Sequence, residues 1–234
     1  ALAAALGRRL VDELEGAPGA IVEQVAALVQ AGWLIPTPEG GLRAGQPMEA
    51  LKNGPLPLPD RVRHKESARI ESLPRDATAI FECLVVLDME ATMELVSEVS
   101  ETDLGPLSTA ISTLNSAGLV HVRSEGVHEV VGLSRARFRD VAYRLITKDR
   151  RTQLHCRAAN ALRNRRTRRT GTFAEVIASH LLSGGQVGEA YPMLLVAAQS
   201  TLRSGNLPAT TKLLDKAERA RATCERSMPA QEAH

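Results

Sequence analysis

Aromatic residues are scarce in this sequence, at 3% of the 234 residues. A core has to be built from Leu, Val, Ala and Ile instead, which favours helices packed on helices over a sandwich of sheets. Hydrophobic residues make up 44% of the chain, enough for a folded core, so prolonged disorder is not expected. The composition therefore predicts a mainly α-helical protein.

Cysteines and long apolar runs are also few. The three cysteines, Cys83, Cys156 and Cys224, lie far apart and form no CxxC pair, so we expect reduced thiols rather than a disulfide framework or a zinc site. No apolar run approaches the ~20 residues that a membrane span needs, and no signal peptide opens the chain. We expect a cytoplasmic protein with no membrane partner. Because the chain opens with Ala1 inside a helical pattern, we also expect it to be a piece of a longer protein.

Catalytic motifs are missing as well. The sequence contains no G-x-x-x-x-G-K-[ST] loop to hold a triphosphate, and no H-E-x-x-H, G-x-S-x-G or H-R-D motif. His121 and His128 could face each other across a hairpin, but no carboxylate or thiol ligand joins them, so exposed strand histidines are the simpler interpretation. His155 and Cys156 are adjacent and point about 100° apart on a helix, which excludes a nucleophile–base pair. We expect no catalytic residue, no metal site, no enzyme activity and no cofactor in this segment.

Helical periodicity is what the sequence does contain. Apolar residues recur at helical spacing over 2–14 and over 20–31, where Gly32 ends the second helix. The stretch 35–59 holds six prolines and four glycines, too many for a helix or a central strand, and it predicts an extended connector.

The stretch 60–134 has the order of elements of a winged helix. The hydrophobic pattern predicts a leading helix over 60–73 and three more over 76–87, 90–99 and 104–117. Asp103 is the expected N-cap of the last of these. Alternating residues on both sides of a turn at 124–126 predict a β-hairpin of 119–123 and 127–133.

The pattern becomes helical again over 135–222. Short turns rich in glycine separate segments in which small alanines recur, and alanine lets neighbouring helices approach closely. This favours tetratricopeptide-like helical hairpins, with a flexible tail over 223–234. The predicted helices span 135–146, 149–164, 172–182, 188–203 and 208–222.

Four sets of motifs, in order, resemble the region that follows the nucleotide-binding core in STAND-type AAA-like signalling ATPases of bacteria. The first set is E-G-A-P-G-A-I-V-E at 15–23 with L-V-Q-A-G-W-L at 28–34, and the second is L-P-D-R-V-R at 58–63 with A-R-I-E-S-L at 68–73. The third is R-D-V-A-Y at 139–143 with R-R and L-H-C-R-A-A within 150–159. The fourth is A-S-H at 178–180 with G-G at 184–185. In that family an ATPase, a winged helix and tetratricopeptide repeats follow one another, sometimes with a kinase domain attached.

The resemblance implies that 1–34 is a remnant of the ATPase lid and that the chain is regulatory. Its partners would be the upstream nucleotide-binding core, which would bind ATP or ADP and Mg, and an unknown protein on the helical repeats. Two departures stand out. Ala17-Pro18-Gly19 replaces the usual Gly-Asn-Pro. Arg135 stands where the family has a histidine that contacts ADP, which makes Arg135 a candidate nucleotide sensor or a sign that sensing is lost.

Positive charge is concentrated in one part of the chain. Thirteen Lys and Arg residues against two acids lie between Arg135 and Arg169. Nucleic-acid binding by a transcriptional regulator module is therefore the alternative function. However, the candidate recognition helix 104–117 contains no Lys or Arg, and the wing offers only Arg123, so contact with an acidic protein partner is favoured. The candidate contact residues for either partner are Arg163, Arg165, Arg166, Arg168 and Arg169.

Overall fold

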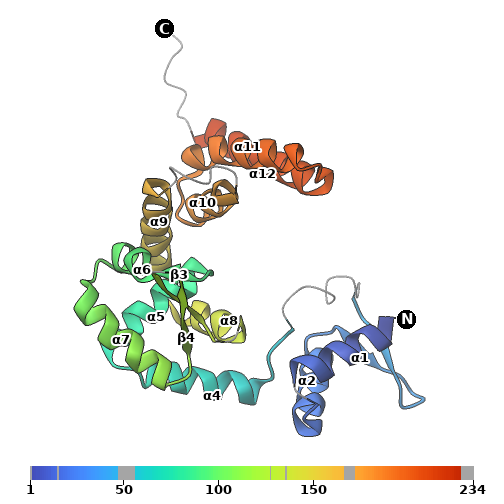
Figure 1. The fold of residues 1–234 in the computed structure, drawn as a ribbon. Helices are drawn as coiled ribbons and strands as arrows, with labels where there is room; N and C mark the ends of the chain where they lie inside the picture. The colour runs from blue at the N-terminus through green and yellow to red at the C-terminus, as the bar shows by residue number, and fades with distance from the viewer. Residues whose placement is uncertain are drawn as a thin grey trace. The chain divides into compact units, whose positions relative to one another are not determined.

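The chain is mainly helical, as its composition predicts, with two small antiparallel sheets in this computed structural model. The structure describes residues 2–14, 16–46, 56–126, 128–134, 136–165 and 172–227. The chain divides into two compact units, Ala1–Ser72 and Leu73–His234 (Figure 1). Within the described residues no helix is both long and apolar enough to cross a membrane.

The first unit is built on a small leucine core. Its elements are α1 (Leu2–Glu13), α2 (Pro18–Gln30), the strands β1 (Leu34–Pro36) and β2 (Leu42–Ala44), and α4 (Asp60–Glu71). Leu10, Leu28 and Leu34 are buried together, and Trp33 packs against them. Helix α2 ends at Gln30, and Gly32, just after its C-cap Ala31, has a φ of 72° that only glycine adopts readily.

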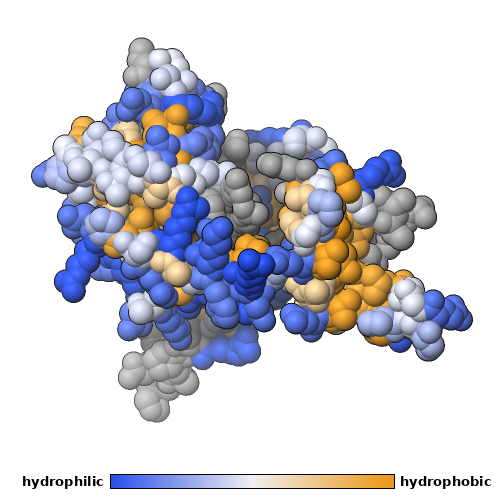
Figure 2. Space-filling view, turned by 90° about the horizontal axis from the view of Figure 1, so that it is seen from below, coloured by the Kyte–Doolittle hydropathy of each residue, from blue (hydrophilic) through white to orange (hydrophobic). Residues whose placement is uncertain are grey.

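Part of the stretch predicted as an extended connector is a hairpin. Leu34 pairs with Ala44 and Pro36 with Leu42, and Gly40 has a φ of 77° in the turn between the strands. Apolar side chains on this unit remain exposed, with Val11, Val22 and Leu42 at 48–68% exposure. Figure 2 shows hydrophobic residues gathered over this unit, at the right of the view. A surface of this kind is typical of a domain that packs on a neighbour.

The second unit begins with a helix that is apolar on nearly every side. Helix α5 (Arg75–Leu87) buries eight of its 13 residues, including Phe81 and Leu84, so it forms the centre of its core. Around it lie β3 (Ala91–Thr92), α6 (Met93–Ser100), α7 (Leu104–Ser116), β4 (Val120–Glu125) and β5 (His128–Leu133). The strand order in the sheet is β3-β5-β4. Asp103 stands at the N-cap of α7 as predicted, although its side chain makes no capping hydrogen bond.

The remaining helices are α8 (Ala136–Leu145), α9 (Lys148–Asn164), α10 (Thr172–Ser183), α11 (Val187–Arg203) and α12 (Leu207–Ser227). From α9 onward each helix packs on the next one along the chain, whereas α8 packs mainly on α5. Helix α9 contacts α10 and also packs against α5 and α6 (Figure 1). Buried alanines such as Ala159, Ala178 and Ala197 let the helix axes approach closely. Because α12 continues to Ser227, the first five residues of the predicted flexible tail are helical.

Candidate functional site

The basic stretch lies against carboxylates of the same chain. Four arginines of α8, of α9 and of its C-cap bind acids on or next to α5 and α6, and we call these four pairs the arginine clasp. They are Arg139 Nε with Asp88 Oδ1 at 2.7 Å, Arg150 Nε with Glu82 Oε2 at 3.2 Å, Arg157 Nη2 with Glu101 Oε2 at 2.6 Å, and Arg165 Nε with Glu98 Oε2 at 3.2 Å.

Helix periodicity places these arginines. Arg150 and Arg157 are seven residues apart on α9, so both face the same side, toward α5 and α6. The side chains of Arg150 and Glu82 are 28% and 25% exposed, so this pair is partly shielded from water. A shielded pair is screened less than an exposed one and holds its partners more firmly. The clasp therefore fastens α9 to the α5–α6 side of the unit.

Two of the five arginines predicted to meet nucleic acid or an acidic partner are engaged within the chain. Arg165 binds Glu98 and also donates to the Thr92 hydroxyl at 3.3 Å. Arg163 binds Glu189 of α11 at 2.7 Å. The other three, Arg166, Arg168 and Arg169, and the candidate sensor Arg135 lie outside the described residues.

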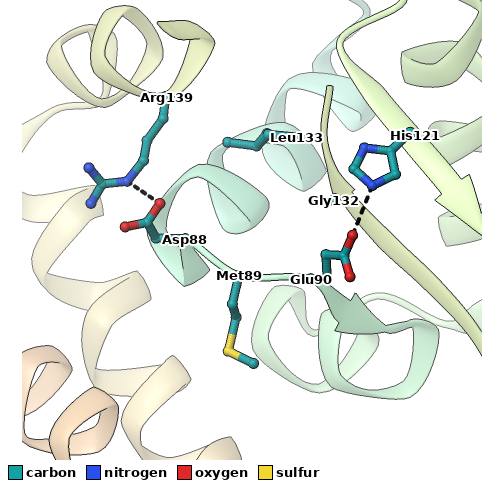
Figure 3. A pocket seen from close by; sticks show the side chains of 7 residues that line it. All are labelled: Asp88, Met89, Glu90, His121, Gly132, Leu133 and Arg139. Atoms are coloured by element: carbon teal, nitrogen blue, oxygen red, sulfur yellow. Dashed lines mark hydrogen bonds and ion pairs between the residues drawn. The ribbon is translucent and has the colours of Figure 1, made fainter. Parts of the chain in front are cut away.

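A pocket of about 250 Å³ opens where α5 ends, between the sheet and the start of α8 (Figure 3). Arg139 in its wall forms an ion pair with Asp88, and His121 Nε2 lies 3.1 Å from Glu90 Oε1. Gly132 keeps the pocket wall open, because a Cβ there would lie 2.8 Å from Cε1 of His121. The lining residues are Asp88, Met89, Glu90, His121, Gly132, Leu133 and Arg139.

Charge pairing sets the protonation of the two acids in this pocket. Hydrogen bonds from Arg123 and His121 lower the pKa of the Glu90 carboxyl to about 2, so it stays ionised. Partial burial raises the pKa of Asp88, and the neighbouring Arg139 opposes that rise. Arg139 pairs with Asp88, and Glu90 bonds to His121 and Arg123, so the described wall of the pocket holds a network of polar contacts.

A second polar network is buried between α8, α9 and α10. The Tyr143 hydroxyl lies 2.9 Å from His155 Nε2, and His155 Nδ1 lies 2.8 Å from His180 Nδ1. The guanidinium carbons of Arg151 and Arg139 lie 4.9 Å and 5.7 Å from the centroid of the Tyr143 ring. Burial, with nearby positive charge, lowers the pKa of both histidines to about 4, so both are neutral at pH 7.

The bond between His155 and His180 was not predicted from the sequence. Both are buried, at 6% and 5% exposure. One signal was available, since Arg139, Tyr143, Arg151, His155 and His180 all belong to the motif sets quoted above at 139–143, 150–159 and 178–180. Arg139 also joins the two networks, because it binds Asp88 and lies over Tyr143.

The two hairpin histidines do not face each other. Their strand partners are Gly132 for His121 and Glu125 for His128, and their side chains lie near Glu90 and Glu94 respectively. Within the described part of the chain, no group of three or more His, Cys, Asp or Glu residues could hold a metal ion.

Comparison of this chain with known protein families, with curated proteins and with solved structures finds no match.

Proposed function

We propose that this chain is a non-catalytic regulatory and interaction segment of a larger STAND-type signalling ATPase. The observation that carries the proposal is the arginine clasp. It holds α9 against α5 and α6 along its length, while Arg163 near the C-terminal end of the same helix binds Glu189 of α11. Binding on the helical hairpins is thereby coupled to the α5–β5 module through one shared helix.

In this proposal residues 60–134 are a winged helix, with its elements from α5 to β5. Three features support it: the chain order α5, β3, α6, α7, β4, β5, the sheet order β3-β5-β4, and the position of α7 before the hairpin. The helices from α8 onward are the start of a tetratricopeptide-like array, and residues 1–34 of the first unit are the remnant of the ATPase lid. The exposed apolar side chains of the first unit suit a surface that packs on the upstream core.

The regulatory mechanism is a shift between two conformations. The winged helix docks on the upstream ATPase core, which binds ATP or ADP and Mg, and favours the inactive state. A protein partner on the helical hairpins favours the released state, and the equilibrium shifts by the difference in the partner's affinity for the two states. The chain itself contributes binding surfaces and the clasp.

Nucleic-acid binding is the alternative, and the surface charges argue against it. Helix α7 contains no Lys or Arg, and the hydroxyls of Thr109, Ser112 and Thr113 bond to backbone carbonyls of their own helix. Arg123 on the wing is held by Glu90. A helix without cations contributes little to binding of the phosphate backbone.

The test uses the native protein. Peptide mapping and intact mass should first reveal a G-x-x-x-x-G-K-[ST] loop upstream of Ala1. Basal ATP hydrolysis is then compared between the native protein, a deletion of 170–222 and the clasp variant Arg150→Ala/Arg157→Ala. Both changes should raise the basal rate. The exposed Arg203→Ala on α11 is the control and should leave it unchanged.

Two outcomes contradict the proposal: an upstream region without the phosphate-binding loop, or a basal rate that neither the deletion nor the clasp variant alters. The alternative is tested separately by the fluorescence anisotropy of labelled duplex DNA and single-stranded RNA at low salt. Binding that weakens steeply with salt and is lost when Arg165, Arg166, Arg168 and Arg169 become Ala would favour the nucleic-acid module.

A further inference from the structure

Four leucines stay exposed on the hairpin formed by α11 and α12. Leu195 and Leu202 of α11 are 38% and 53% exposed, and Leu207 and Leu214 of α12 are 62% and 48% exposed. The two leucines of each helix are seven residues apart, and residues with that spacing lie on the same side of a helix. Each helix therefore presents one exposed pair of leucines.

Both pairs lie on the same face of the hairpin. The turn at Gly205 makes the helices antiparallel, so Leu202 lies level with Leu207 and Leu195 with Leu214. Helix α12 meets α11 on the side of Thr201, whose Oγ1 lies 2.9 Å from Oγ1 of Thr210.

Helix geometry fixes which face this is. At ~100° per residue, the α11 leucines lie about 150° from Met193 and Ala197, which are buried on the other side of α11. On α12 the two exposed leucines lie about 90° around the helix from the buried Leu213 and Ala217. Viewed from the N-terminus of each helix, this offset runs in the same direction as the offset of the leucines on α11. In an antiparallel pair this places both rows together, on the face turned away from α10. We call Leu195, Leu202, Leu207 and Leu214 the leucine face.

We propose that the leucine face binds the leucine face of a second copy of this chain, forming a two-fold symmetric dimer. The residues between the leucines favour this occupant, because Gln199 and Thr211 are uncharged and two copies can meet without opposing like charges. Farther along α12, Arg221 binds both Glu218 and Glu225, so most of the charge at that end of the face is paired within one copy and a net charge of −1 remains there.

The size of the face sets the expected strength of the dimer. Helix α11 has 17 residues and is about 25 Å long, and two helices side by side are about 20 Å wide. Each copy therefore offers about 500 Å², and a dimer would bury about 1,000 Å² in all, near the lower limit of specific interfaces. The dimer is consequently weak, and it forms and dissociates with protein concentration.

The experiment is sedimentation velocity of the 234-residue chain from about 1 to about 500 µM, a range that brackets a weak interface. The weight-average mass should rise from 25.2 kDa toward twice that value. Leu202→Glu/Leu214→Glu should raise the dissociation constant about tenfold or more, because two charges per copy would then be buried in the interface. Both leucines are about half exposed, so the fold should persist, and circular dichroism checks that it does.

Two matched controls locate the interface. Leu104 of α7 has the same 53% exposure as Leu202, and Val22 of the first unit is 68% exposed. Leu104→Glu and Val22→Glu should each dimerise as the unaltered chain does. A chain that stays monomeric throughout the concentration range overturns the proposal, as does a dimer that survives Leu202→Glu/Leu214→Glu or is lost in either control.

A charge-exchange experiment tests the two-fold arrangement without removing a leucine. Gln199→Lys/Thr211→Lys and Gln199→Glu/Thr211→Glu each place like charges opposite one another and should be monomeric alone. An equimolar mixture should recover the dimer, because opposite charges then meet across the interface. A mixture that stays monomeric overturns the face-to-face arrangement.

Discussion

His155 Nδ1 lies 2.8 Å from His180 Nδ1, so two histidine rings on consecutive helices share a single proton between nitrogens of the same kind. One nitrogen donates and the other accepts, and the pair is satisfied only while it carries one proton at this contact. The Tyr143 hydroxyl bonds the far nitrogen of His155, and Arg139 and Arg151 lie over the tyrosine ring. An additional proton would add positive charge to a buried site that two arginines already surround.

The first prediction is that mild acid destabilises the fold through this pair. The pKa of both histidines is about 4 in the folded chain against an ordinary value of 6.5. Between these values the unfolded chain binds more protons than the folded chain. The stabilisation is therefore fully present above pH 6.5 and is lost as the pH falls toward 4. Urea denaturation should show a decrease of about 1–3 kcal/mol in the free energy of unfolding across this window.

His155→Gln/His180→Gln should lower stability at pH 7 and flatten this pH dependence between 6.5 and 5, above the range in which carboxylates titrate. His64→Gln, at an exposed position of α4, should keep the full pH dependence. Equal stability of the unaltered chain at pH 7 and pH 4.5 would contradict the prediction.

The second prediction concerns the Tyr143 hydroxyl. Tyr143→Phe keeps the ring beneath the two arginines but removes a hydrogen bond to the buried His155. The free energy of unfolding should fall by about 1–2 kcal/mol, because a polar nitrogen is left buried without its partner. Tyr191→Phe, at the half-buried second tyrosine of the chain, should cost less. Equal effects of the two substitutions in thermal and urea denaturation would show that the hydroxyl contributes nothing specific.

The third prediction tests the close approach of α9 to the end of α10. A Cβ on Gly184 would lie 2.8 Å from Cys156 Sγ, so Gly184→Ala should destabilise the fold by about 1–3 kcal/mol. Cys156→Ala should recover part of that loss in the double variant, since it removes the clashing sulfur. Gly188→Ala is the matched control, because its Cβ would meet only Cys224 Sγ at 3.8 Å and should be neutral or mildly stabilising. Strict additivity of the Gly184 and Cys156 substitutions would rule out this contact as the cause.

The fourth prediction compares a shielded ion pair with an exposed one. A double-mutant cycle on Arg150 and Glu82 should give a coupling of about 1 kcal/mol that persists in moderate salt, because both side chains are partly buried. The same cycle on Arg61 and Glu23, whose side chains are 87% and 39% exposed, should give a coupling near zero. If both cycles give the same value, burial does not determine the strength of the clasp.

Local elements could be predicted from the sequence because periodicity and caps depend on neighbouring residues. Helix α7 was expected over 104–117 and runs from Leu104 to Ser116. Strand β3 was missed and included in a helix predicted over 90–99, since its two residues become a strand only by pairing with β5, where Ala91 lies opposite Val131. The short hairpin β1–β2 was missed for a similar reason, because its prolines and glycines favoured a connector.

Contacts between distant residues could not be predicted in this way. Arg150 and Glu82 are 68 positions apart, and the packing of α9 on α5 is what brings them together. The basic stretch was therefore visible as a charge excess, but its carboxylate partners were not. The bond between His155 and His180 likewise depends on how α9 and α10 lie against each other.

Helix α9 packs on α5 and α6 as well as on α10. A fragment that stops at Leu133 would leave Glu82, Glu98 and Glu101 without their arginine partners and uncover the side of α5 that α8 and α9 now shield. A fragment that keeps the ion pairs around α5 intact therefore has to include α9 through Arg165, well past the end of the β-hairpin. Expression boundaries, and the units in which the second half of this chain unfolds, should follow α9 rather than the last strand.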